Sequence, residues 1–196
     1  MRIAVSGTHS VGKSTFVHDF VKKYPDYIRE EEPYRALCDW YDILFGKAAT
    51  RYHNGIQLLY NISRIKHYHA SSASVIFDRS PIDYLPYSLY PAKYAQTDID
   101  LSFVESLVDS IRDSLKFLDI IAYVPMTDKH PIEIEDDGIR LTDPEYRQAV
   151  DDYFKEIYVD NRFNLLGDSD SPVLLEVWGS RAQRIQQLEA CIASLN

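Results

Sequence analysis

A glycine-rich run near the start of the chain has the residue types and spacing of a phosphate-binding loop. Residues 7–15 read GTHSVGKST and match the pattern G-x-x-x-x-G-K-[ST] at every fixed position. In such a loop the glycines allow a tight turn in which several backbone N–H groups converge on an anion, and the following helix adds its positive N-terminal end. Nucleotide phosphate groups are the natural ligand. The residues predicted to bind them are Gly7, Thr8, His9, Ser10, Val11, Gly12, Lys13, Ser14 and Thr15.

Two side chains of this run have specific predicted roles. Lys13 would reach the β- and γ-phosphates as a mobile point charge, and the Ser14 hydroxyl would be a ligand of Mg²⁺. The His9 side chain needs no role of its own. The alternative interpretation is a strand-to-helix turn that binds nothing. It is disfavoured because a strand-like run at residues 2–5 (RIAV) precedes it and an amphipathic pattern over 13–24 follows it.

A second group of chemically useful residues follows a β-rich apolar run at 74–78, which ends in Asp78 and is followed by Arg79. Ligands of open parallel sheets gather at the carboxyl ends of the strands, so both side chains should face the same crevice as the phosphate-binding loop. Asp78 could hold the water shell of Mg²⁺, and Arg79 could orient an acceptor or a phosphate. The alternative is an Asp–Arg ion pair that only caps the strand end.

Arg147 is a further candidate for contact with an anion. Asp143 and Pro144 have the pattern of a helix N-cap and first helical residue, so Arg147 lies in the first turns, where the helix dipole disfavours a cation. Its presence there hints at an anionic ligand. A surface ion pair with Asp143 or Asp151 is the alternative.

Alternating strands and helices must position these groups. The predicted strands are 2–6, 27–33, 74–78, 119–124 and 173–177. The predicted helical segments are 13–24, 37–72, 104–115, the helix that starts at 143–144, and a final helix that ends near 195. Residues 27–33 suit an edge strand because Pro33 lacks a backbone N–H. This alternation favours a parallel sheet with helices on both faces.

Other details of these segments are also predicted. The segment 37–72 is expected to be interrupted only near Gly46 and Gly55, and Thr97 or Asp98 is the expected N-cap of the helix over 104–115. Four tyrosines between 84 and 94 are expected mainly to pack in the core. The polar stretch 127–142 reads as an excursion over the surface.

Composition limits the class of protein. The chain has 196 residues, enough for one well-buried domain. Its formal net charge of −9 disfavours a general surface for binding nucleic acid or an anionic membrane. Its two cysteines lack the spacing of a zinc site or a disulfide framework, which fits a reducing cytoplasm. Ser6 and Gly7 interrupt the first apolar segment before a signal-peptide core could form, and no later run approaches membrane-spanning length. We expect a cytoplasmic single domain without a nucleic-acid or membrane partner; its oligomeric state is left open.

The motifs in their order resemble the nucleoside and nucleotide kinase branch of the P-loop proteins, and within it the small AAA-like ATP-binding domains of the ribosylnicotinamide kinase type. The resemblance rests on residues 7–15, Glu32-Pro33, Asp78-Arg79-Ser80 and the stretch 137–140. It implies a P-loop NTPase fold of three α/β/α layers with a five-stranded parallel sheet in the order 2-3-1-4-5.

The resemblance also implies roles for particular residues. Lys13 and Ser14 would handle ATP and Mg²⁺, and Glu32 resembles the carboxylate that activates the acceptor in deoxynucleoside kinases. Asp78 and Arg79 belong to a segment that is similar to the acidic-Arg-Ser motif of those enzymes. Arg140, with Arg147 as a second candidate, resembles the arginine of a mobile lid, here the segment 127–142.

The predicted function is an ATP- and Mg²⁺-dependent phosphotransfer to a hydroxyl group of a small nucleoside-like metabolite. A hydroxyl must lose its proton as it attacks, which a carboxylate assists, whereas a phosphate acceptor is already anionic. Glu30 projects to the same side as Glu32 by strand alternation and is an alternative base. The alternative functions are a nucleotide monophosphate kinase and an ATPase or GTPase regulatory module; no Asn-Lys-x-Asp sequence is present to read guanine.

Overall fold

Five parallel strands form the centre of the molecule. The computed structural model describes residues 1–44, 46–127 and 143–195. The strands are β1 (Arg2–Ser6), β2 (Tyr27–Glu30), β3 (Ser74–Asp78), β4 (Ile120–Tyr123) and β5 (Val173–Glu176). Their order in the sheet is β2-β3-β1-β4-β5, which confirms the predicted topology.

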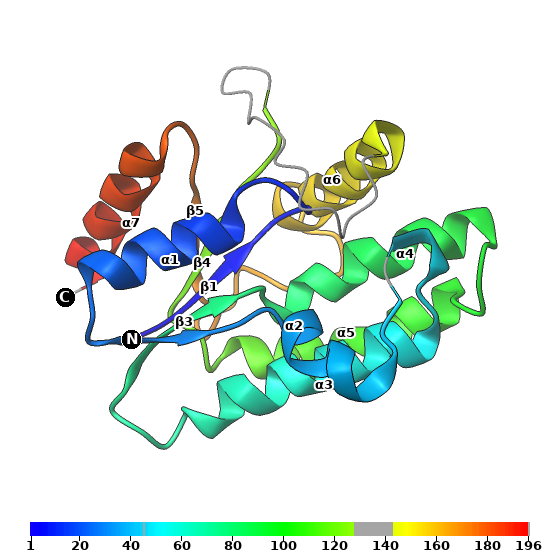
Figure 1. Cartoon of the computed structure of the whole chain (residues 1–196), viewed down its shortest axis with the longest axis horizontal. Helices are drawn as coiled ribbons and strands as arrows, with labels where there is room; N and C mark the ends of the chain where they lie inside the picture. Colours follow the sequence, from blue (N-terminus) through cyan, green and yellow to red (C-terminus); the bar gives the residue numbers. More distant parts are fainter. Residues whose placement is uncertain (45, 128–142, 196) are drawn as a thin grey trace.

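Helices cover both faces of this sheet (Figure 1). The α-helices are α1 (Lys13–Lys23), α2 (Pro33–Tyr41), α3 (Arg51–His67), α4 (Tyr84–Tyr94), α5 (Leu101–Leu115), α6 (Pro144–Tyr158) and α7 (Arg181–Leu195). Two 3₁₀ turns are η1 (Gly46–Ala48) and η2 (Pro81–Asp83). Helices α1 and α7 lie on one face, and α3, α4, α5 and α6 lie on the other.

Alternation along β1 explains why two cores form. Ile3 and Val5 belong to the core under α1 and α7, whereas Ala4 between them belongs to the core under α3 to α6. Successive side chains of a strand point to opposite faces, so a central strand that is covered twice must be apolar throughout. The run Ile3-Ala4-Val5 meets that requirement, and all three residues are buried.

The register of the sheet brings the candidate groups together at one edge. Val5 of β1 pairs with Asp78 of β3, and Ser6 pairs with Tyr123 of β4. Because the strands are parallel, the phosphate-binding loop after β1 lies beside the residues that follow β3 and β4. The expectation that Asp78 and this loop share one edge of the sheet is confirmed.

Two predicted boundaries are wrong in the first half of the chain. The edge strand ends at Glu30, and Pro33 opens α2, because its missing N–H is harmless in the first turn of a helix. The predicted interruption near Gly46 is confirmed, because α2 and α3 are separate helices. Asp42 adopts a left-handed conformation (φ 41°) that ends α2, and Gly46 follows with a φ of 61°. Gly55 lies within α3 and does not interrupt it.

One predicted helix cap is wrong, and the tyrosine-rich segment forms a helix. The N-cap of α5 is Asp100, whose side chain accepts a hydrogen bond from the backbone N–H of Phe103, in place of Thr97 or Asp98. The tyrosine segment is helical from Tyr84 to Tyr94 despite Pro91 inside it. The final helix ends at Leu195, as predicted.

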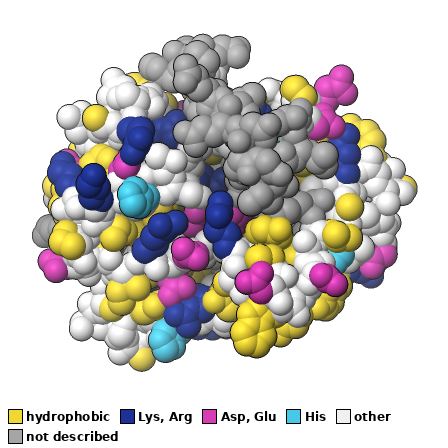
Figure 2. Space-filling view, viewed as in Figure 1, with side chains coloured by type: hydrophobic (Ala, Val, Ile, Leu, Met, Phe, Trp, Pro, Cys, Tyr) yellow, Lys and Arg dark blue, Asp and Glu magenta, His cyan; other side chains and the backbone are white. Residues whose placement is uncertain are grey.

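The surface carries charges of both signs. Figure 2 shows basic and acidic side chains side by side over the middle of this face, and apolar side chains over α2 and α3. The exposed apolar residues of α2 include Trp40 and Tyr41, and Leu44 follows that helix. Among the described residues, no helix combines the length and apolar character needed to cross a bilayer.

Candidate active site

The loop after β1 has the backbone shape of an anion-binding turn. Gly7 and Gly12 have φ values of 139° and 80°, which side chains rarely allow. A Cβ atom on Gly7 would lie 2.5 Å from the carbonyl oxygen of Val124, so only glycine fits there. Helix α1 begins directly after Gly12, and its N-terminus is therefore part of the loop.

Lys13 lies inside this loop. Lys13 is only 4% exposed, and its Nζ donates a hydrogen bond to the carbonyl oxygen of Thr8 at 2.6 Å. The ammonium group thus reaches back to the start of the turn. A cation and several N–H donors in one buried turn can bind the oxygens of a phosphate chain.

Ser14 and Asp78 form a pair of oxygen ligands suited to Mg²⁺. Ser14 Oγ donates to Asp78 Oδ2 at 2.5 Å, while Asp78 Oδ1 is buried and has no hydrogen-bond partner among the described residues. Burial raises the pKa of Asp78, and the nearby negative charge of Glu32 raises it further. A hard divalent cation takes oxygen ligands and would compensate this charge. The donor set therefore fits Mg²⁺.

Glu32 and Arg79 form a buried ion pair next to the phosphate-binding loop. Arg79 Nε donates to Glu32 Oε1 at 2.6 Å, and the Glu32 residue is 1% exposed. Burial alone would lower the pKa of Arg79, but the charges of Glu32 and Asp83 help to hold it well above its usual value. The partners of Arg79 are thus Glu32 and Asp83, and the alternative of a simple pair with Asp78 is wrong.

The backbone of Arg79 is unusual. Its φ is 96°, and its N–H still donates to the carbonyl oxygen of Val5 on the central strand. A non-glycine residue in this conformation costs on the order of 1–3 kcal/mol, and such strain is found preferentially at functional sites. The guanidinium lies over the ring of Tyr87, with 4.9 Å between its Cζ and the ring centroid.

Glu30 lies in a different environment from Glu32. Its carboxylate accepts hydrogen bonds from Arg64 Nη2 at 2.6 Å and from the Tyr68 hydroxyl at 2.5 Å. Burial works to raise the pKa of Glu30, but these hydrogen bonds outweigh it and hold the pKa below its usual value. Glu30 is therefore tied to α3, whereas Glu32 is tied to the arginine that follows β3.

Asp83 is a part of the site that sequence reasoning missed. It is fully buried; Oδ1 accepts from Ser6 Oγ at 2.5 Å and from the Ser80 backbone and hydroxyl, and Oδ2 accepts from Arg79 Nη1 at 3.3 Å. The Tyr158 hydroxyl completes the network by donating to Ser6 Oγ at 2.6 Å. Asp83 thus binds Arg79 through Nη1, whereas Glu32 binds it through Nε. Its spacing of four residues from Arg79 was the available signal, but acidic residues at that spacing are common on helices.

We expect Asp83→Asn to lower the free energy of unfolding by about 3 kcal/mol, because the variant leaves the buried Arg79 with one carboxylate fewer. Urea denaturation monitored by circular dichroism measures this change. Asp109→Asn is the matched control, since the Asp109 side chain is 93% exposed and pairs with Arg112 on the surface. That control should change the free energy of unfolding by less than about 1 kcal/mol. Equal stability of the two variants would contradict the assignment.

His9 contacts aromatic residues from two helices. Its ring stacks on Tyr146 of α6, with the ring centroids 5.6 Å apart, and its Nδ1 lies 3.5 Å from the Tyr87 hydroxyl of α4. The sequence assigned this side chain no role of its own. The structure places it as the link between the phosphate-binding loop and the two helices.

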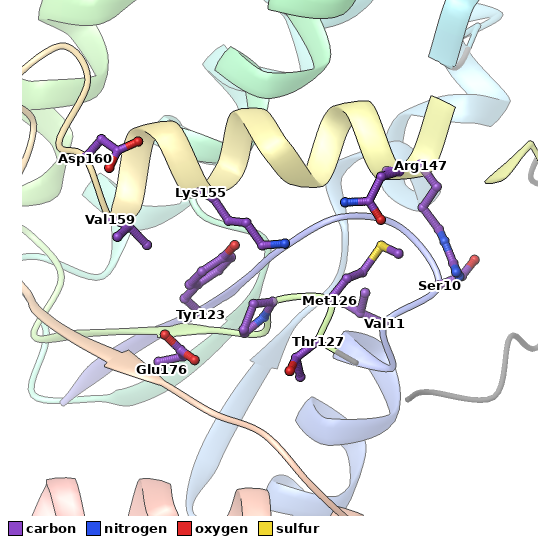
Figure 3. Close-up of a pocket in the computed structure, with 12 residues that line it drawn as sticks. Ser10, Val11, Tyr123, Met126, Thr127, Arg147, Lys155, Val159, Asp160 and Glu176 are labelled. Atoms are coloured by element: carbon purple, nitrogen blue, oxygen red, sulfur yellow. The ribbon is translucent and has the colours of Figure 1, made fainter. Parts of the chain in front are cut away.

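Arg147 lines a cavity of about 690 Å³ that opens beside the phosphate-binding loop (Figure 3). In Figure 3 its guanidinium lies beside Ser10, and Lys155 extends from the same helix farther along the cavity. Arg147 Nε is buried without a hydrogen-bond partner among the described residues. Contact of Arg147 with an anionic ligand stays a prediction. Arg140 and all but the first residue of the predicted lid 127–142 lie outside the described residues.

Comparisons with known proteins agree with this architecture. The model of a family described as an AAA domain matches residues 2–172. Deoxyadenosine kinase from M. mycoides with the products dCMP and dCDP bound superposes with a TM-score of 0.66 at 20% identity, and the match covers all of both chains. NadR protein in complex with NR superposes with a TM-score of 0.68 at 18% identity over 96% of this chain. The chain spans 50% of that NadR chain. No curated protein sequence matches.

Proposed function

The chain belongs to the AAA-domain family and has a P-loop nucleotide kinase-like fold, and from this premise we propose that it is an ATP- and Mg²⁺-dependent kinase. The acceptor in this proposal is a hydroxyl group of a small, nucleoside-like metabolite. The observation that carries the proposal is the buried Glu32–Arg79 pair at the edge of the sheet where the phosphate-binding loop lies. A loop that only bound a nucleotide would not need a buried carboxylate and guanidinium beside it.

On the donor side, the loop and Lys13 bind the phosphate chain of ATP. The backbone N–H groups and the ammonium group spread the charge that develops during phosphoryl transfer. Ser14 and Asp78 would hold Mg²⁺, which supplies charge neutralisation at the phosphate oxygens when bound.

On the acceptor side, Glu32 holds and orients the hydroxyl group and takes up its proton as the oxygen attacks the terminal phosphorus. Arg79 fixes the Glu32 carboxylate through its Nε, and Asp83 in turn fixes Arg79. Burial of all three residues keeps water away from the carboxylate and so favours transfer to the acceptor over hydrolysis. The similarity to deoxyadenosine kinase and to NadR in complex with NR supports a nucleoside-like acceptor.

A screen for acceptor-dependent ADP release tests the proposed function. The purified chain is incubated with ATP and Mg²⁺ and a panel of ribonucleosides, deoxyribonucleosides and NR, each beside its 5′-monophosphate. We expect ADP release with at least one alcohol acceptor and formation of its phosphate ester, detected by mass spectrometry. Turnover of monophosphates alone would identify a nucleotide monophosphate kinase instead. ATP hydrolysis that no acceptor accelerates would favour a regulatory module.

A further inference from the structure

A buried arginine from the last helix lies against the back of the phosphate-binding loop. Arg184 of α7 is 7% exposed, although most of α7 is at the surface. Its neighbour one turn earlier, Arg181, is an exposed side chain that forms an ion pair with Asp19 of α1. The two arginines therefore share a helix and a charge but differ in burial.

The Arg184 guanidinium is held by two backbone carbonyl groups. Nη1 donates to the carbonyl oxygen of Val11 at 2.8 Å, and Nε donates to that of Gly179 at 3.1 Å. No ion pair links Arg184 to a carboxylate of the described residues, and burial lowers its pKa. An arginine stays protonated in proteins, so a positive charge is buried here against carbonyl oxygens alone. Two carbonyl acceptors offset only part of that cost, which points to a function beyond packing.

The first contact determines the orientation of one peptide unit in the loop. A trans peptide is planar, with its C=O and N–H pointing in opposite directions. Fixing the Val11 carbonyl toward Arg184 therefore turns the N–H of Gly12 away from the guanidinium of α7. Gly12 follows with a φ of 80°, and a Cβ atom there would lie 3.3 Å from Arg184 Nη1. The positive φ favours glycine at this position, and a Cβ atom would also crowd the guanidinium.

The second contact connects another loop to the same group. Gly179 lies between β5 and α7 and has a φ of 83°. Arg184 thus bridges the phosphate-binding loop and the loop after the edge strand β5, which are more than 160 residues apart in sequence. Movement of either loop changes the position of the same guanidinium.

We propose that Arg184 is a positioning residue of the donor-phosphate site. It holds the Val11–Gly12 peptide so that the Gly12 N–H is presented to the phosphate chain, and it couples this orientation to the loop at Gly179. The proposal rests on the proposed function in one respect, that the loop at residues 7–15 binds a nucleoside triphosphate. It does not depend on which acceptor is phosphorylated.

Nucleotide affinity without an acceptor tests this role. The dissociation constant of ADP with Mg²⁺ is measured by calorimetry for the wild type, Arg184→Met, Arg184→Lys and the matched control Arg181→Met, at a temperature where all four are folded. We expect Arg184→Met to weaken ADP binding about tenfold, since it releases the Val11 carbonyl. Arg184→Lys should recover part of this loss, because an ammonium can bind the Val11 carbonyl but lacks the fixed fork with which the guanidinium reaches both carbonyls. Arg181→Met should bind ADP within about twofold of the wild type.

Steady-state kinetics separate positioning from general damage. Arg184→Met should raise the KM for ATP and leave the KM for the acceptor unchanged, a split that a merely destabilised protein would not give. Unaltered ADP affinity in folded Arg184→Met, or an equal loss in Arg181→Met, would overturn the proposal. If Arg184→Met does not fold, wild-type ADP affinity in Arg184→Lys overturns it. ADP binding that responds to Arg184 while no acceptor is phosphorylated would overturn the proposed kinase activity alone.

Discussion

Replacing Lys13 with alanine is expected to lower the turnover number with ATP roughly 10³-fold and to weaken ATP binding, while the protein still folds. Lys13 is buried within the loop, with Nζ 2.6 Å from the Thr8 carbonyl oxygen, so no other cation can take its place without rebuilding the turn. The loss of one hydrogen bond to a backbone carbonyl costs only about 1 kcal/mol of stability. Turnover at saturating ATP and the melting temperature are the two measurements.

Lys22→Ala provides the control for this prediction. Lys22 is in the last turn of the same helix, α1, and is exposed. Its removal deletes the same charge without touching the loop, and turnover should stay within about twofold of the wild type. Near wild-type turnover of Lys13→Ala at saturating ATP would show that the phosphate-binding assignment is wrong.

The second large effect is expected for Glu32→Gln, which should lower turnover about 10²–10⁴-fold, the range for loss of a positioned acid or base. The amide oxygen can still accept the hydrogen bond from Arg79 Nε, but an amide cannot take up the proton of the acceptor hydroxyl. The KM for ATP should change little, because Glu32 lies on the acceptor side. Initial rates over a pH series, together with a melting curve for each variant, measure the effect.

Glu30→Gln distinguishes the two neighbouring carboxylates. It removes the same charge, but from a group that binds Arg64 of α3 and Tyr68 at the C-cap of that helix. We expect Glu30→Gln to keep turnover within about threefold of the wild type and to lower stability modestly. Full activity of Glu32→Gln, or a larger loss in Glu30→Gln, would falsify the assignment of the base and favour a phosphate acceptor.

Local patterns were sufficient to predict the loop at residues 7–15 and its position beside Asp78. The spacing of glycines and lysine in residues 7–15 determines the loop by itself, and the rule that parallel strands end at one edge places Asp78 beside Ser14. Their hydrogen bond of 2.5 Å agrees with that expectation. The strand order came from the family resemblance, because periodicity alone does not say which strands are neighbours.

Contacts between distant segments are the part that the sequence did not reveal. Asp83 and Arg184 belong to no motif, and each matters only because folding brings it to a partner: Ser6 is 77 residues from Asp83, and Val11 is 173 from Arg184. The exact end of α2, ahead of Gly46, was missed for a related reason. Asp42 adopts a left-handed conformation that ends α2. An aspartate or asparagine is a weaker signal in the sequence for the end of a helix than a glycine is.

The position of β1 in the sheet has a consequence for biosynthesis. It precedes the other strands in the chain but is central in the sheet: Arg2 pairs with Val75, and Ile3 pairs with Ile120. During translation this apolar strand therefore stays unpaired until β3 and β4 have been synthesised. Such non-local pairing slows folding and prolongs the exposure of apolar surface. Gly7 fits against the Val124 carbonyl only once β4 is in place, so the nucleotide-binding loop acquires its shape late. A nucleotide would consequently select chains with a completed sheet, and protection from proteolysis by ADP during refolding would report how many have reached it.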